Sequence, residues 1–119
     1  MAKKHYTFYI DTEITVKKGT EIFLNRKRIN LLRNIRYSGS ILSASKTMQI
    51  SYQQAWTYIK EMNELSPLPI VIRQRGGSNG GGAIVTPYGL DLIEKYLKME
   101  QMQKDYLVSL NQILDDCFL

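Results

Sequence analysis

The sequence predicts an α+β fold that is mostly helical, in which a β-hairpin is followed by three helices, a second hairpin and one long helix. Three observations carry this prediction. Apolar residues alternate with polar ones near the N-terminus, recur at helical spacing through the middle of the chain, and do so again towards its end. Stretches rich in proline and glycine separate the last two regions. The 119 residues suffice for one modest core, so we expect a single domain over 1–119.

A strand and a turn are expected first. From Tyr6 to Val16 the even positions carry apolar residues or threonine, whereas most odd positions are polar. This period of two is typical of a strand with one buried face. Lys18 and Gly19 provide a turn before a shorter apolar run. Together these features predict a β-hairpin within 6–24.

Three helices are predicted over 26–65, each preceded by a residue whose side chain can accept a hydrogen bond from a free helical N–H. These residues are Asn25, Ser40 and Ser51, and the second helix is expected to end near Thr47. Apolar residues at steps of three and four give the first and third helices a buried face. The inward residues are Ile29, Leu32 and Ile35 in the first helix and Ala55, Ile59 and Met62 in the third.

Residues 40–65 form a helix-turn-helix pattern. Ser51 and Gln54 make a capping box at the start of the second helix of this pair. On the face opposite its apolar stripe, Gln53 and Thr57 lie in the first two turns. A glutamine amide can pair with adenine and a threonine methyl group can contact thymine, so this end of the helix suits the major groove of DNA. An ordinary helical bundle remains an equally open interpretation of the pattern alone.

A second hairpin, the wing, is predicted over 70–86. Its strands contain β-branched residues, and the segment Arg73–Gly82 between them carries five glycines. Glycine lets a backbone approach a phosphate chain closely, and Arg73 and Arg75 add positive charge. A hairpin tip without any ligand is the alternative. A nucleotide phosphate loop is discounted, because the glycines lead into a strand and not into Lys-Ser/Thr and a helix.

A long helix over 87–116 is expected to follow. Thr86 and Pro87 suit its N-cap and its first position. Its 30 residues would extend about 45 Å, which exceeds the width of about 35 Å expected for a compact domain of this size. The exposed stripe is most simply buried against a second copy in a two-fold dimer, and a bend near Gln103 is the alternative. The stripe consists of Leu92, Tyr96, Met99, Tyr106, Leu110 and Ile113.

The net charge of +5 is unevenly distributed along the chain. Residues 1–75 contain 13 Lys and Arg against 5 Asp and Glu, a balance of +8, whereas residues 76–119 contain 3 against 6, a balance of −3. Part of the positive charge stands in the first turn of the first helix, as Arg26, Lys27 and Arg28. Such a basic region favours a polyanionic partner, because Lys and Arg on phosphates release condensed counterions. A solvated basic surface without a partner is the alternative.

The composition gives little support to several other classes of function. One cysteine, Cys117, and one histidine, His5, leave almost nothing for a zinc site or a Cys/His catalytic pair. The close carboxylate pairs of the last helix suit a solvated surface better than an active site, so we expect no enzyme, metal or cofactor. No apolar run approaches the roughly 20 residues that cross a bilayer, and the polar start is not a signal peptide. We therefore expect a cytoplasmic protein without membrane contact.

Three stretches of the sequence, in fixed order, resemble one known family: SGSILSASK, ISYQQAWTYIKEMNELS and RGGSNGGGAIVTPYG. They are similar to the N-terminal winged-helix domain of the ModE-type molybdate-dependent transcription regulators. The resemblance implies a bacterial, dimeric protein that binds DNA through a winged helix-turn-helix. The residues that carry it are Ser38, Gly39, Ser40, the pairs Ser51/Tyr52 and Ala55/Trp56, Asn63, Gly76, Gly77, Gly80, Gly81, Gly82, Thr86 and Gly89.

The sequence departs from the pattern of this family at two positions and in length. Gln49 stands where the family has a small residue, commonly glycine, in the inter-helix turn, and Gln53 stands where a basic residue is common. In the full-length members of the family, separate C-terminal domains bind molybdate. This chain ends at Leu119 without such domains, so we do not expect it to bind molybdate by itself in that way.

The resulting hypothesis is a sequence-specific DNA-binding transcriptional regulator that acts as a homodimer. Gln53, Gln54 and Thr57 would contact bases, while other residues would hold the DNA backbone. The alternative is a protein-interaction module on a winged-helix scaffold, with only non-specific DNA binding. The expected DNA-binding residues are Ser40, Lys46, Ser51, Tyr52, Gln53, Gln54, Thr57, Lys60, Arg73, Arg75 and Ser78.

Overall fold

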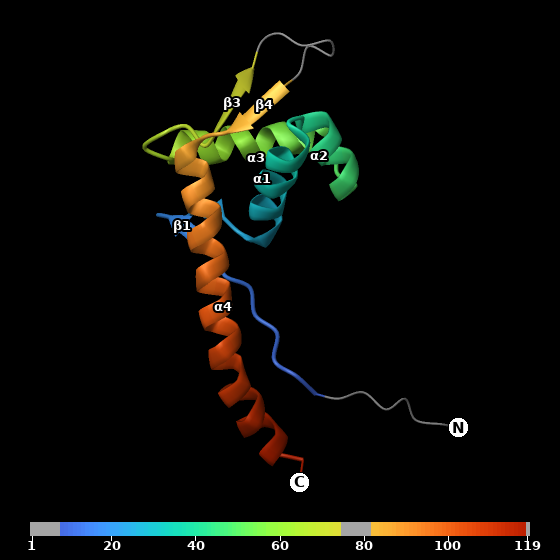
Figure 1. Ribbon diagram of the computed structural model, residues 1–119. Helices are drawn as coiled ribbons and strands as arrows, with labels where there is room; N and C mark the ends of the chain where they lie inside the picture. Colours follow the sequence, from blue (N-terminus) through green and yellow to red (C-terminus); the bar gives the residue numbers. More distant parts are fainter. Residues whose placement is uncertain (1–7, 75–81, 119) are drawn as a thin grey trace, which may run out of the picture.

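The protein consists of a head, made of three helices and two small sheets, from which one long helix projects (Figure 1). The computed structural model describes residues 8–74 and 82–118. Strands β1 and β2 pair antiparallel, as do β3 and β4, and the predicted α+β winged helix-turn-helix is confirmed. In chain order the elements are β1 (Val16–Lys18), β2 (Glu21–Leu24), α1 (Arg26–Ser38), α2 (Ile41–Met48), α3 (Tyr52–Leu65), β3 (Val71–Gln74), β4 (Gly82–Val85) and α4 (Pro87–Asp116).

Each helix begins directly after the N-cap residue that the sequence indicates. Side-chain oxygens of Asn25, Ser40, Ser51 and Thr86 accept hydrogen bonds from the backbone N–H three residues further on, at 2.9, 3.1, 2.9 and 3.0 Å. These bonds satisfy donors that the first turn of a helix otherwise leaves free. The starts of the helices are therefore determined locally, by the residue type at one position each.

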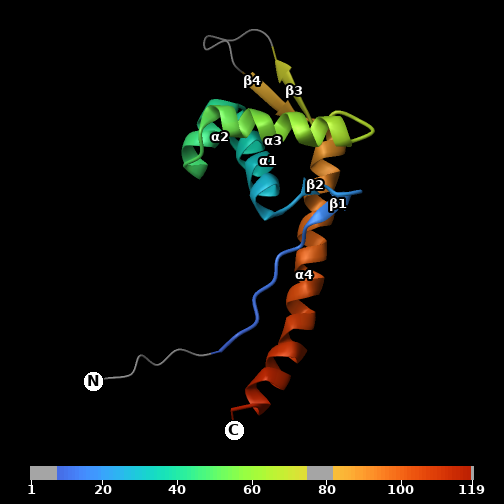
Figure 2. The same ribbon diagram turned by 180° about the vertical axis from the view of Figure 1, so that it is seen from behind.

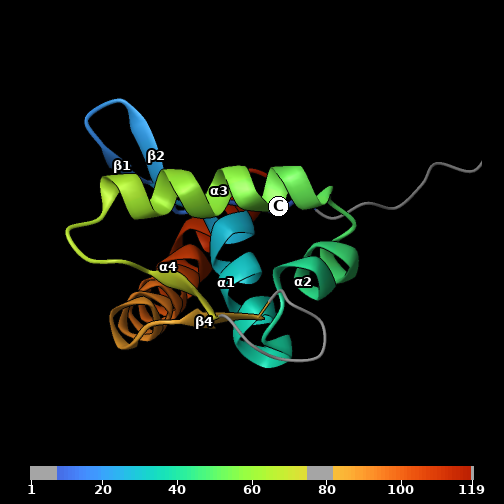
Figure 3. The same ribbon diagram turned by 90° about the horizontal axis from the view of Figure 1, so that it is seen from above.

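Helix α1 supplies the centre of the core. Leu31, Leu32 and Ile35 are fully shielded from solvent, and they belong to one cluster with Ile59 and Met62 of α3. Seen from above, α3 lies across α1, with α2 beside them (Figure 3). All the inward residues predicted for α1 and α3 are buried, which confirms the helical periodicity read from the sequence.

The prediction of a long N-terminal strand is wrong. Residues 8–15 are extended, but β1 begins only at Val16 and pairs over three residues. The segment instead runs beside α4 (Figure 2), where the backbone N–H of Ile10 donates to Asn111 Oδ1 at 2.8 Å. Its even positions from Ile10 onwards are half-buried and its odd positions are exposed. A period of two thus reports one covered face of an extended chain, and here a helix provides much of the cover.

Contacts at both ends hold this segment in place. Near its start, the ring of Phe8 stacks on that of Phe118, with centroids 4.2 Å apart. Beyond its end, the turn predicted at Lys18 and Gly19 is present, with Gly19 at φ 62°. Lys18 Nζ donates to the carbonyl of Leu65 at 3.0 Å, so the hairpin β1–β2 is attached to the C-terminal end of α3.

Helix α4 runs unbroken from Pro87 to Asp116, so the bend considered near Gln103 is not found. Its first turns pack on the head, and the rest projects, which gives the molecule a length of 62 Å. Tyr96 requires a correction, because it is fully buried in the core of its own protomer and cannot belong to an exposed dimer face. Within the described ranges, no helix is both long and apolar enough to span a membrane.

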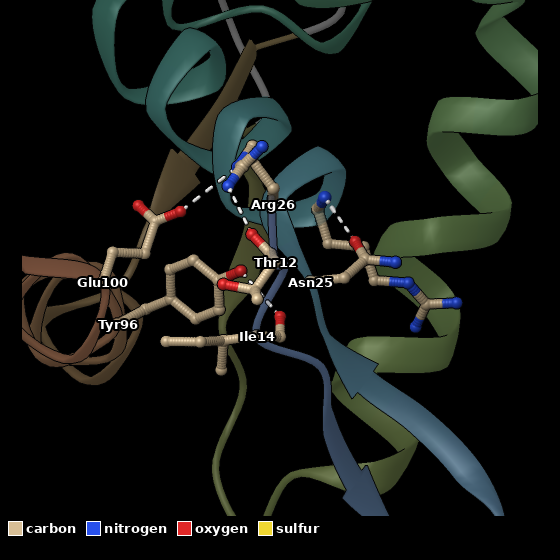
Figure 4. A network of polar contacts seen from close by, with 7 residues as sticks. Thr12, Ile14, Asn25, Arg26, Tyr96 and Glu100 are labelled. Atoms are coloured by element: carbon tan, nitrogen blue, oxygen red, sulfur yellow. Dashed lines mark hydrogen bonds and ion pairs between the residues drawn. The ribbon is translucent and has the colours of Figure 1, made fainter. Parts of the chain in front are cut away.

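A polar network joins α4, α1 and the N-terminal segment (Figure 4). The Tyr96 hydroxyl donates to the carbonyl of Ile14 at 2.7 Å. Arg26 donates to Glu100 at 3.2 Å and to the carbonyl of Thr12 at 3.3 Å. The bonds to Ile14 and Thr12 satisfy backbone carbonyls that a strand partner would otherwise have satisfied.

The turn between α2 and α3 is made by Gln49, which has the left-handed conformation φ 57°, ψ 39°. Its N–H donates to the Lys46 carbonyl at 3.1 Å, and the N–H of Ile50 donates to the Ser45 carbonyl at 3.0 Å. Side chains other than glycine are strained in this region because of the Cβ atom. The turn therefore keeps the tight geometry for which glycine is better suited.

Tyr96→Phe should lower the free energy of unfolding by about 1 kcal/mol, because the Ile14 carbonyl loses its donor. Burial, followed by the carboxylates of Glu100 and Glu13, raises the pKa of the Tyr96 hydroxyl above its ordinary value of 10.0. The folded state thus holds this proton more tightly than the unfolded state. The stability that results is complete below pH 10.0 and is lost as the pH rises through the raised pKa of the folded state. Urea denaturation below and above that pH measures both effects.

Tyr37→Phe is the control for this substitution, since Tyr37 is 93% exposed and lies outside the apolar stripe of α4. It should leave both the stability and its alkaline decline unchanged. If the free energy of unfolding of Tyr96→Phe fell with rising pH as steeply as that of the wild type, Tyr96 would not be the source of the alkaline loss of stability.

Gln49→Gly should stabilise the protein by about 1 kcal/mol, because glycine adopts the left-handed conformation without the cost of a Cβ atom. Thermal denaturation measures the change. Gln49→Ala is the control, as it shortens the side chain but retains the Cβ atom, and it should give no such gain. A stabilisation equal in the two variants would show that the backbone conformation is not its source.

Candidate nucleic-acid interface

Helix α3 presents two chemically different faces. Ala55, Ile59 and Met62 are buried in the head, whereas Gln53 and Thr57 are exposed on the other side. The Thr57 hydroxyl donates to the Gln53 carbonyl at 3.0 Å, so its hydrogen is used within the helix. The two side chains are therefore brought together on one outward face, one turn apart, as their spacing predicts.

A shallow groove of about 540 Å³ lies along this outward face. Its described lining residues all come from α3, and the indole of Trp56 is one of its walls. Trp56 is not among the DNA-binding residues predicted from the sequence. A tryptophan one turn before the exposed Lys60, on a helix that precedes a basic hairpin, is the signal that could have identified it. The groove is lined by Gln53, Trp56, Thr57, Lys60, Asn63 and Glu64.

The wing brings Arg73 against Trp56, one of the residues that line the groove. Arg73 was expected in the loop, but it lies in β3 and pairs with Ala83 of β4. The guanidinium carbon stands 4.0 Å from the centre of the Trp56 ring, and Tyr52 meets the same ring edge-on at 6.4 Å. A cation over an aromatic face is attracted by the electrons of the ring, so Trp56 holds the Arg73 charge at the edge of α3.

Polar contacts fix α3 to the neighbouring elements. Asn63 accepts from the N–H of Ile70 at 2.8 Å and donates to the carbonyl of Val71 at 3.0 Å, which ties α3 to β3. Arg28 of α1 forms an ion pair with Glu61 of α3. The same guanidinium donates to the carbonyl of Ile22 at 2.8 Å, and Arg28 as a whole is only 5% exposed. Arg28 thus holds α3 in place through Glu61, and its charge is not available to a phosphate.

The base of the wing is tied to the start of α2. The N–H of Ala83 donates to the carbonyl of Gly39 at 3.0 Å, and Ser40 and Gly82 form an isolated β-bridge. The Ser40 and Ser51 hydroxyls accept from the N–H groups of Ser43 and Gln54 and so cap α2 and α3. Wing and helix-turn-helix therefore form one connected surface.

The other predicted site residues are distributed over this surface. Lys46 on α2 and Lys60 on α3 are exposed, whereas Gln54 is half-buried. Arg75 and Ser78 lie outside the described residues. Among the residues that the structure describes, no group of three or more His, Cys, Asp or Glu could hold a metal ion.

The dimer residues predicted on α4 differ in their surroundings. Leu92 and Leu110 are half-buried. Met99, Tyr106 and Ile113 are 40%, 64% and 65% exposed. Together with Met102, which is 65% exposed, the last three form an apolar stripe along the projecting part of the helix.

Comparisons with known proteins identify close relatives. The chain is 40% identical over 96 residues to the transcriptional regulator ModE of Haemophilus influenzae, which covers 79% of the chain and 38% of that protein. It is 44% identical over 91 residues to the DNA-binding transcriptional dual regulator ModE of Escherichia coli, and the match covers 76% of this chain and 35% of that protein. For the molybdenum transport protein ModE of Azotobacter vinelandii, the identity is 39% over 107 residues, and the match covers 90% of this chain and 37% of that protein.

The chain thus spans little more than a third of the length of these relatives. No protein-family model matches it. Among solved structures, the full-length LTTR LysG from Corynebacterium glutamicum superposes with a TM-score of 0.55 at 23% identity, over 74% of this chain and 29% of that one. At that identity the likeness supports the fold alone. By sequence and fold together, the chain is a ModE-like winged-helix domain, similar to the N-terminal part of the ModE-type regulators.

Proposed function

We propose that this protein binds specific sequences of double-stranded DNA as a homodimer and thereby regulates transcription. The observation that carries the proposal is the outward face of α3, where Gln53 and Thr57 stand exposed beside the Arg73 charge. The name of the Escherichia coli relative, a DNA-binding transcriptional dual regulator, supports the same partner. Helix α3 is accordingly the recognition helix of the proposal.

Two kinds of contact follow from the positions of the side chains. Gln53, Gln54 and Thr57 lie in the first two turns of α3, the part of a recognition helix that reaches base edges in the major groove. Lys46, Lys60 and Arg73, with Ser40, Ser51, Tyr52, Arg75 and Ser78, would contact the sugar–phosphate chain. Such contacts fix the register of the protein on DNA but carry no sequence information.

The apolar stripe of α4 supports the homodimer. Leu92, Met99, Tyr106 and Ile113 follow one another at intervals of seven residues, the period of helices that pack in pairs. The last three are exposed in the single chain, which is unfavourable in water. Two copies joined along the stripe would present their recognition helices to successive major grooves, about 34 Å apart.

Selection of bound sequences from a random pool of DNA duplexes tests the proposal as a whole. A two-fold symmetric motif with two half-sites is the expected outcome. Binding that depends on salt but enriches no motif would overturn it. That result would favour a protein-interaction module that uses the exposed stripe of α4 for another partner.

Gln53→Ala and Thr57→Ala should each reduce the discrimination between the selected site and a mismatched site by about 1 to 3 kcal/mol, because each removes a contact to a base edge. Arg73→Gln should instead weaken binding to every sequence alike and reduce the slope of affinity against salt concentration by about one charge. Binding titrations at two salt concentrations measure both quantities.

Two further substitutions of Thr57 separate its methyl group from its hydroxyl group. Thr57→Val keeps a methyl group at the γ position and should keep the discrimination, because the hydroxyl already bonds within the helix. Thr57→Ser keeps the hydroxyl group but has no γ-methyl group, so it should lose the discrimination between sites. The reverse pattern would mean that the hydroxyl contacts the DNA. Indistinguishable behaviour of Gln53→Ala and Arg73→Gln would contradict the division into base and backbone contacts.

Ile113→Glu should convert the dimer to a monomer, since it places a charge on the apolar stripe of each copy. Val108→Glu is the matched control: Val108 is 60% exposed against 65% for Ile113, and lies about 140° away around the same helix. It should remain dimeric. Analytical ultracentrifugation gives the result, and a monomeric wild type, or equal behaviour of the two variants, would exclude this dimer face.

A further inference from the structure

Helix α4 meets the head at Gly89, in its first turn, at a point where no side chain fits. A Cβ atom on Gly89 would stand 2.6 Å from the carbonyl oxygen of Ile70 and 2.7 Å from Cγ1 of Val85. Separations below 3.0 Å require one of the two atoms to move. Gly89 does not have positive φ, so glycine is needed here for close approach and not for its backbone conformation.

The surroundings of Gly89 cannot easily give way. The Ile70 carbonyl accepts from the N–H of Thr86 at 2.9 Å. The Thr86 hydroxyl donates to the Pro69 carbonyl at 2.6 Å and accepts from the N–H of Gly89 at 3.0 Å. The atom that a Cβ would meet first is thus backbone that already holds the start of α4. The easier response to a larger residue is a movement of α4 itself.

Such a movement would be magnified along the helix. Gly89 and Tyr96, which is buried in the head, are about 10 Å apart along the axis, and Ile113 lies about 25 Å beyond Tyr96, at 1.5 Å per residue. A displacement of about 1 Å at Gly89, pivoting on Tyr96, would therefore move Ile113 by about 2.5 Å. If the stripes of two copies are joined, the same tilt moves the two heads relative to each other by several ångströms.

We propose that Gly89 is a positioning residue that sets the angle between α4 and the head, and thereby the spacing of the two DNA half-sites that the dimer accepts. The proposal rests on the dimeric DNA binding proposed above. A base-pair step is about 3.4 Å, so a relative displacement of several ångströms corresponds to about one base pair. Gly89 touches no DNA in this arrangement; it acts through α4.

The experiment measures the affinity of the full chain for palindromic duplexes whose half-sites are moved apart in steps of one base pair. The wild type should show a single optimal spacing. Gly89→Ala should shift that optimum by about one base pair, while its affinity for an isolated half-site stays unchanged. A loss of stability alone would lower the amount of folded protein at every spacing and would not move the optimum.

Gly82→Ala is the matched control. Gly82 also has a backbone conformation that other residues adopt, but among the described residues the nearest atom to a Cβ there, Cβ of Gln74, is 3.6 Å away, an ordinary contact. This variant makes the same chemical change at a place that accommodates it, so its optimal spacing should equal that of the wild type. A folded Gly89→Ala protein with the wild-type optimum would overturn the proposal.

If Gly89→Ala does not fold, the contact between Gly89 and Val85 can be tested by changing Val85 instead. Val85→Ala removes the methyl group nearest to Gly89 and should broaden the range of accepted spacings. Val71→Ala is its control: Val71 pairs with Val85, is likewise 5% exposed, and is not among the atoms nearest to a Cβ at Gly89. Identical spacing profiles in these two variants would reject the role of Gly89.

The outcomes also separate this proposal from the one on which it rests. A wild-type protein that binds single half-sites specifically but shows no spacing optimum would refute the dimer geometry, and the role of Gly89 with it. A wild type with a sharp optimum that neither Gly89→Ala nor Val85→Ala changes would leave the proposed function standing and remove only the role of Gly89.

Discussion

The buried guanidinium of Arg28 is the constraint on which the arrangement of the head depends. A cation shielded from water must be paired, and its partners here come from two other elements, Glu61 on α3 and the Ile22 carbonyl on β2. The ring of Tyr58, with its centre 5.1 Å from the guanidinium carbon, adds a favourable aromatic contact. Because α1, α3 and the first hairpin satisfy the same group, they cannot shift independently, and the outward face of α3 keeps one orientation.

The two surfaces of this protein are built on opposite principles. The outward face of α3 is polar and lies on a helix held by Arg28 and Asn63, which suits the recognition of a partner with fixed geometry. The outer part of α4 carries the apolar stripe and projects from the head, which suits burial against another helix. The packing of Gly89 against Ile70 and Val85, which leaves no room for a side chain, joins the start of α4 to the head.

Much of the fold could be predicted because it is determined locally. Asn25, Ser40, Ser51 and Thr86 each decide a helix start through a hydrogen bond three residues away, and α4 spans the residues that its periodicity indicates. Features that depend on distant neighbours were missed. The alternation over 8–15 could not reveal that a helix would lie beside the segment. Nor could the pattern of α4 show that Tyr96 belongs to the core. For the site, the spacing predicted the exposed face of α3, but the stacking of Arg73 on Trp56 joins residues from two elements.

The stacking of Phe8 on Phe118 brings both ends of the described chain to the same pole of the molecule, at the tip of α4 and far from α3 (Figure 1). A chain segment that continues from Phe8 or from Phe118 would therefore leave the described part of the molecule from that pole. Chains immobilised through one terminus would accordingly stand with their polar helix-turn-helix turned towards the solution. The same geometry would let a short peptide join Phe8 to Phe118 with little disturbance of the head.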